Sequence, residues 1–90
     1  MLEGSVTVVN PLGLHARAAA QLVRLAGKYR SRILLRRVDS GAFANAKSIL
    51  SVLALAAPVG TMLRLEVDGG DEREAFDAIL ELFAVGFGES

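Results

Sequence analysis

The residues best suited to chemistry lie together in residues 10–17, which read Asn-Pro-Leu-Gly-Leu-His-Ala-Arg. This stretch holds the only histidine of the 90 residues, His15, and Arg17 follows two positions later. Asn, Pro and Gly are typical of a loop, and the Ala- and Leu-rich segment 16–26 predicts a helix. The sequence therefore places His15 at the junction between a loop and the first turn of a helix.

A helix N-terminus favours a particular chemistry for that imidazole. The first N–H groups of a helix lack intrahelical acceptors and the dipole is positive there, which favours the neutral, nucleophilic ring. If the ring carried a phosphoryl group, the backbone N–H groups of Ala16 and Arg17 would donate to that anion. The Arg17 guanidinium adds a fork of donors that matches phosphate oxygens. Because a helix terminus contributes only about 0.3–1 kcal/mol at an exposed site, the arrangement favours transient storage of phosphate.

Each residue also has a simpler interpretation when it is taken alone. A lone histidine before a helix is usually an exposed loop residue that helps to cap the helix, and an isolated arginine is usually just solvated. The whole of residues 10–17, rather than His15 or Arg17 by itself, favours the chemical interpretation.

Three separated blocks resemble the histidine-containing phosphocarrier (HPr) family of the bacterial sugar phosphotransferase system. They are residues 10–17, residues 47–52 (Lys-Ser-Ile-Leu-Ser-Val) and residues 86–89 (Gly-Phe-Gly-Glu). The resemblance implies that His15 is phosphorylated on its δ nitrogen, with Arg17 as its partner. One position departs from the family, because Ala18 stands where a proline usually follows the arginine. We expect Ala18→Pro to stabilise the fold by about 0.4–1 kcal/mol.

The same resemblance implies the partners of the chain. His15 would accept a phosphoryl group from the phosphoenolpyruvate-dependent enzyme I and donate it to enzyme IIA domains. The chain would be a carrier and a substrate of these proteins rather than an enzyme, with no metal and no organic cofactor. The predicted partner-binding residues are Ile49, Leu50, Ala20 and Arg24. A place in the core is the competing interpretation of Ile49 and Leu50.

Ser48 matches the regulatory serine of the family. The resemblance therefore adds an HPr serine kinase/phosphorylase and a transcriptional regulator to the expected partners. Ser48 is also the natural N-cap of the helix that follows it, an interpretation that requires no kinase.

The apolar pattern predicts an α+β fold in the order β-α-β-β-α-β-α. Strands are expected over 5–9, 31–38, 42–44 and 62–68, and helices over 16–26 and 49–56.

The helices are expected to pack through apolar faces. The last helix would carry an apolar stripe of Phe76, Ile79, Leu80 and Phe83. The first would pack through a small-residue face of Ala16, Ala19, Ala20, Val23 and Ala26. Asp71 and Glu74 have the spacing of a capping box, and Gly86 suits a left-handed C-cap. We expect an HPr-like open-faced sandwich, a four-stranded antiparallel sheet with three helices on one face, as a single domain over 1–90.

Composition excludes several classes of protein. Ten basic residues balance ten acidic ones, which argues against nucleic-acid binding. The chain has no cysteine, so disulfides and thiolate metal sites are excluded. The apolar stretch 49–59 is too short to insert across a membrane, and no signal peptide is visible. We therefore expect a cytoplasmic protein, and a monomer.

Two other functions remain open from the sequence. One is a regulatory protein-binding module of the same fold, in nitrogen or carbon control, that does not turn over phosphate. The other is a small α+β domain that senses a metabolite in a closed apolar cavity. A nucleophile retained at His15 beside Arg17 argues against the first, and a closed apolar cavity in place of an exposed His15 would support the second.

Overall fold

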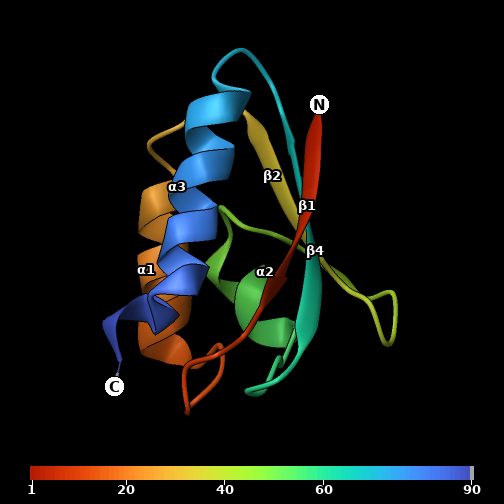
Figure 1. The fold of residues 1–90 in the computed structure, drawn as a ribbon, viewed down its shortest axis with the longest axis vertical. Coiled ribbons are helices and arrows are strands. Elements are labelled where there is room, and N and C mark those ends of the chain that lie inside the picture. Colours follow the sequence, from red (N-terminus) through yellow and green to blue (C-terminus); the bar gives the residue numbers. More distant parts are fainter. Residues whose placement is uncertain (90) are drawn as a thin grey trace.

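The computed structural model describes residues 1–89 and confirms the predicted order of elements (Figure 1). The strands are β1 (Leu2–Thr7), β2 (Arg32–Arg37), β3 (Phe43–Asn45) and β4 (Met62–Asp68). The helices are α1 (Ala16–Ala26), α2 (Ile49–Ala54) and α3 (Glu72–Ala84), followed by a 3-10 turn, η1 (Gly86–Gly88).

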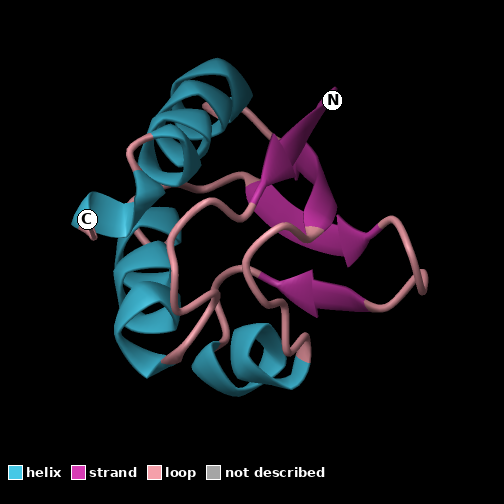
Figure 2. Cartoon of the chain, turned by 60° about the horizontal axis from the view of Figure 1, so that its bottom comes forward, coloured by secondary structure: helices cyan, strands magenta, loops and turns pink. Residues whose placement is uncertain are grey.

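The sheet has the strand order β1-β4-β2-β3, and every neighbouring pair is antiparallel. Central strand β4 alternates as expected, since Leu63, Leu65 and Val67 are buried and the residues between them face outward. Figure 2 shows the helices gathered on one side of the sheet, with its other face open. α1 contacts both α2 and α3, and α2 also contacts β3. This is the predicted open-faced sandwich.

The helices bury their apolar faces against the sheet, although one face differs from the prediction. On α3, Phe76, Ile79 and Phe83 are buried as expected, and the fourth residue of the predicted stripe, Leu80, is half-buried. On α1 the buried residues are Ala18, Ala19, Leu22 and Ala26, whereas the predicted Ala16 is exposed and Ala20 and Val23 are half-buried. The buried positions 18, 19, 22 and 26 themselves follow helical spacing, and the predicted face differed because it left out Leu22.

Several element boundaries are corrected by pairing with neighbours. β1 spans Leu2–Thr7 rather than the predicted 5–9 because it pairs along nearly all of β4, from Leu2 opposite Val67 to Thr7 opposite Met62. β2 is one residue shorter than predicted at each end, and β3 is shifted by one residue toward the C-terminus. The ends of a strand depend on the hydrogen bonds to its neighbouring strand, so one segment of sequence does not determine them.

α2 ends two residues before the predicted Ala56. Ala56 has a left-handed φ of 51°, which stops the helix. The Arg37 side chain donates hydrogen bonds to the carbonyls of Leu55 and Ala56, at 3.1 Å each. Arg37 thus satisfies acceptors that the helix leaves open at its C-terminal end.

The predicted capping box of α3 is wrong. Asp71 occupies the N-cap position, but its carboxylate makes no cap hydrogen bond. It accepts instead from the backbone N–H groups of Arg30 and Ser31 and from the Ser31 hydroxyl, at 2.8, 2.9 and 2.6 Å. Glu72, rather than Glu74, accepts from a backbone N–H of the preceding turn, that of Gly69. Tertiary donors outcompete the local cap at this site.

Across residues 1–89, no helix has the length and apolar character needed to span a membrane. The longest, α3, has 13 residues, and a bilayer span needs about 20.

Candidate functional site

The loop before α1 is fixed in place by a turn and a close backbone contact. Gly13 N–H donates to the Asn10 carbonyl at 3.0 Å across Pro11 and Leu12, and neither central residue has a positive φ, as a type I turn requires. Gly13 itself has a φ of +69°, and a Cβ there would lie 2.7 Å from the carbonyl oxygen of Ala57. The loop therefore rests directly on the segment after α2, and only glycine fits at this contact.

His15 is the N-cap residue of α1, as the sequence predicted. Its backbone is extended, with φ −74° and ψ −179°, and the Arg17 N–H donates to the ring Nδ1 at 3.3 Å. The side chain is 26% exposed, so the ring is neither buried in the core nor free in solvent. One edge of the imidazole thus faces the first amides of the helix.

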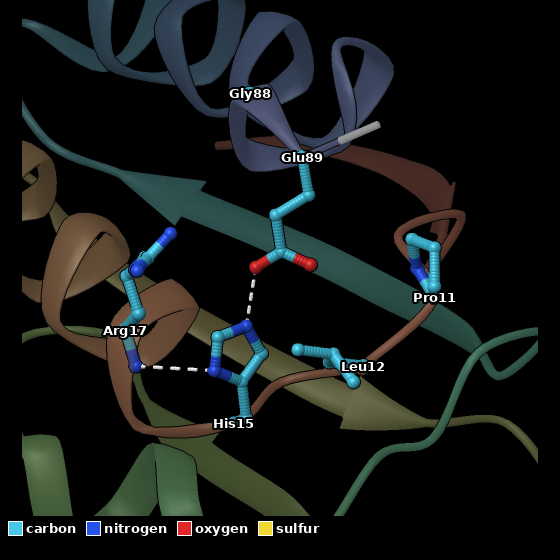
Figure 3. A pocket seen from close by; sticks show the side chains of 6 residues that line it. All are labelled: Pro11, Leu12, His15, Arg17, Gly88 and Glu89. Atoms are coloured by element: carbon cyan, nitrogen blue, oxygen red, sulfur yellow. Dashed lines mark hydrogen bonds and ion pairs between the residues drawn. The ribbon is translucent and has the colours of Figure 1, made fainter.

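The other ring nitrogen contacts a residue that the sequence analysis did not single out. Nε2 of His15 is hydrogen-bonded to the carboxylate of Glu89 (Figure 3). The second Glu89 oxygen accepts from Nδ2 of the buried Asn10 at 3.3 Å, and the same Nδ2 donates to the Gly13 carbonyl at 2.7 Å. The hydrogen bond from His15 holds the pKa of the Glu89 carboxyl below its usual range, and Asn10 and the Arg17 charge act in the same direction.

The turn after α3 brings Glu89 to the histidine. Gly86, Phe87 and Gly88 all have positive φ, of 60°, 57° and 75°, so the chain reverses with a left-handed turn. A positive φ is unfavourable for phenylalanine. The ring of Phe87 is 3% exposed and packs edge-on against Phe83 with 5.0 Å between centroids. Burial of this ring anchors the turn and with it Glu89.

These residues surround an open pocket next to the histidine. Its lining comprises Pro11, Leu12, His15, Arg17, Gly88 and Glu89 (Figure 3). Arg17 is exposed, and its side chain borders the pocket on the α1 side. Within residues 1–89, no three His, Cys, Asp or Glu side chains are grouped as a metal ion would require. The charged groups of the lining are the Arg17 guanidinium, which can donate to an anion, and the Glu89 carboxylate.

Glu89 and Asn10 were missed as site residues because they act through tertiary contacts. Residues 86–89 appeared in the sequence only as a matching block, and Asn10 only as part of a loop. The one available signal was that two matching blocks at opposite ends of the chain each contain polar residues among glycines.

The second predicted region surrounds α2. The Ser48 hydroxyl accepts from the Ser51 N–H at 3.3 Å, which confirms its role as N-cap. Ile49 and Leu50 are 38% and 76% exposed, so the interpretation that places them in the core is wrong. On the adjacent α1, Ala20 is half-buried and Arg24 is exposed.

Fold and site together define a class of protein: a small α+β sandwich that presents one histidine at a helix N-terminus beside an arginine. A family model described as "PTS HPr component phosphorylation site" matches residues 2–84. The chain is 49% identical over 89 residues to the phosphocarrier protein HPr of Cupriavidus necator, with 99% of this chain and 98% of that protein covered. It is 39% identical over 88 residues to the phosphocarrier protein NPr of Klebsiella oxytoca, with 98% and 97% covered.

A solved HPr structure from Thermoanaerobacter tengcongensis matches with a TM-score of 0.94 and 37% identity, covering 100% of this chain and 99% of that one. The chain therefore belongs to the HPr family of phosphocarrier proteins of the phosphotransferase system.

Proposed function

We propose that this chain carries a phosphoryl group on His15, accepting it from phosphorylated enzyme I and donating it to enzyme IIA domains in sugar uptake. The observation that supports this most is the position of the ring. Its Nδ1 accepts from the Arg17 N–H at the first turn of α1, and the ring borders an open pocket. Membership of the HPr family supports the same role.

The transfer follows from this geometry. The Nδ1 lone pair attacks the phosphorus of the donor, a P–N bond forms to His15, and the bond from phosphorus to the donor's leaving group breaks. The amide N–H groups of Ala16 and Arg17 and the Arg17 guanidinium then face the new phosphoryl oxygens. All of these donors lie at an exposed helix terminus, so they stabilise the group modestly and release it to the next acceptor.

The partner face comprises Ile49, Leu50, Ala20 and Arg24. Exposed apolar side chains beside a functional residue are a typical docking surface, and the charge of Arg24 would steer an acidic partner. α2 contacts α1, so this face belongs to the same side of the molecule as the helix that begins at His15. The contact would be small and short-lived, as a carrier that exchanges partners requires.

Ser48 is the proposed regulatory site, with an HPr serine kinase/phosphorylase and a transcriptional regulator as the partners that use it. Its hydroxyl now caps α2, and phosphorylation would place negative charge next to Ile49 and Leu50. That charge would oppose docking of an acidic partner. Phosphopeptide analysis of the protein from its native cell tests this, and phosphate on another residue in place of Ser48 would contradict it.

The deciding experiment for the carrier role is labelling with enzyme I and radioactive phosphoenolpyruvate. We expect an acid-labile label on the wild type, loss of the label in His15→Ala, and transfer to an added enzyme IIA domain. An unlabelled wild type would favour a regulatory module of the same fold that binds partners without turning over phosphate. Sedimentation during the assay tests the proposed monomer, and cell fractionation tests the proposed cytoplasmic location.

A further inference from the structure

We infer that Glu89 determines which nitrogen of His15 accepts the phosphoryl group, because it holds a proton on Nε2 and covers that nitrogen, leaving Nδ1 as the nucleophile. Glu89 would be a specificity-determining residue of the carrier. The inference rests on the proposed function, since it concerns the same histidine.

The first step of the argument is the tautomer. The Arg17 backbone N–H donates to Nδ1, so Nδ1 must carry a lone pair. A neutral imidazole has one N–H, which then lies on Nε2 and donates to the Glu89 carboxylate. An ionised carboxylate can only accept. Both contacts of the ring therefore favour the same tautomer.

The second step is the accessibility of the two nitrogens. Figure 3 shows the Glu89 carboxylate at one edge of the ring and the Arg17 amide at the other. A protonated nitrogen has no lone pair to attack phosphorus, and the carboxylate beside it repels an incoming phosphoryl group. At Nδ1 the neighbour is the backbone N–H of Arg17, which attracts that group. The two edges of the ring thus differ in nucleophilicity and in local charge.

The third step is that Glu89 is held in place by the fold. Its side chain is 11% exposed, and Asn10, itself 1% exposed, donates to its second oxygen. The buried ring of Phe87 anchors the preceding turn. A carboxylate fixed from two sides acts as a permanent partner of Nε2 rather than as a mobile surface charge.

A small-molecule phosphoryl donor tests this proposal without any partner protein. Phosphoramidate transfers its phosphoryl group directly: the Nδ1–P bond forms, the donor's P–N bond breaks, and ammonia leaves. The ring keeps its Nε2 proton and becomes a cation, whose charge Glu89 balances. Without the Glu89 carboxylate both tautomers become populated, and Nε2 becomes an alternative site of attack.

The test compares wild type, Glu89→Ala, Glu89→Gln and a control, Glu81→Ala, on protein labelled with ¹⁵N in histidine. Glu81 is an exposed glutamate of α3. Ring ¹⁵N shifts at a pH where the imidazole is neutral report the tautomer, and ¹⁵N–³¹P spectra after brief phosphoramidate treatment report the phosphorylated nitrogen.

We expect the Nε2–H tautomer and Nδ1 phosphorylation in wild type and in Glu81→Ala. Glu89→Ala should show mixed tautomers and a several-fold rise in the Nε2 product. Glu89→Gln keeps an acceptor oxygen and should retain most of the wild-type tautomer, and the wild-type tautomer itself tests the proposal even if Glu89→Ala does not fold.

The inference is overturned if a folded Glu89→Ala keeps both the wild-type tautomer and the wild-type product, or if the wild-type ring carries its proton on Nδ1. A wild type that phosphoramidate does not label on His15 contradicts the proposed function instead, and the tautomer spectra still decide the role of Glu89.

Discussion

At the scale of single residues, His15 has a structural role in addition to its chemistry. Its Nδ1 accepts the N–H of Arg17 and so caps α1, a role more often filled by Ser, Thr, Asp or Asn. His15→Ala removes both the nucleophile and the cap, whereas His15→Asn keeps a cap acceptor and removes only the nucleophile. We expect Ala to cost about 0.5–1 kcal/mol of stability and Asn less, with neither variant labelled by phosphoenolpyruvate. Urea unfolding measures the difference, and equal stabilities would show that the cap contributes nothing.

Ala18 is a second residue whose position makes a prediction. It lies in the first turn of α1, where a backbone N–H lacks an intrahelical acceptor, so a proline there breaks no hydrogen bond of the helix. Ala18 is fully buried, so the added ring must also fit the core. We expect Ala18→Pro to raise the free energy of unfolding by about 0.4–1 kcal/mol, because proline restricts the unfolded chain. This stabilisation should raise Tm by a few degrees. A lower Tm would mean that the added ring does not fit.

At the scale of elements, the loop before α1 depends on its contact with the segment after α2. Gly13 and Gly41 both have positive φ, of 69° and 77°, but a Cβ at Gly41 has nothing within 4 Å. Gly41→Ala therefore measures the backbone cost alone, about 1–2 kcal/mol, and Gly13→Ala adds a clash with Ala57 and Pro58. We expect the Gly13 variant to be clearly less stable and to accept phosphate more slowly. Equal losses in thermal unfolding would show that the loop moves freely away from that contact.

At the scale of the whole molecule, Asp71 ties the start of α3 to the turn between α1 and β2. Hydrogen bonds from the Ser31 hydroxyl and from the Arg30 and Ser31 backbone lower the pKa of Asp71 from 3.8 to about 2. Because the pKa is lower in the folded state, this stabilisation is complete above the unfolded value and is lost as the pH falls toward about 2.

We therefore expect Asp71→Asn to be less stable than wild type near neutral pH, with the difference shrinking below roughly pH 4. The exposed Asp77→Asn serves as the matched control. Unfolding curves across this range check the prediction, and a difference that stays constant with pH would contradict the assignment of the shift to these bonds.

The sequence predicts this molecule well wherever a signal is local. The order of elements, the range of α1, the N-cap Ser48 and the place of His15 at the start of α1 all arise within a few consecutive residues, and the structure confirms them. The errors arise where distant segments meet. Asp71 bonds to the loop after α1 instead of its own helix, and Glu89 reaches a histidine 74 positions away. Residue spacing does not contain these contacts, because the folded arrangement of α1 and α3 creates them.

The distance along the chain between His15 and Glu89 has a consequence for protein synthesis. A ribosome makes His15 74 positions before Glu89, so a growing chain at first carries the imidazole without the carboxylate that contacts Nε2. Only a chain that has been made through Glu89 and has folded forms the pair, since residues 86–88 must first pack against the end of α3. On the proposed role of Glu89, chains that stop before it should therefore take phosphate on either ring nitrogen, and selectivity for Nδ1 should appear only with folding of the longer chain.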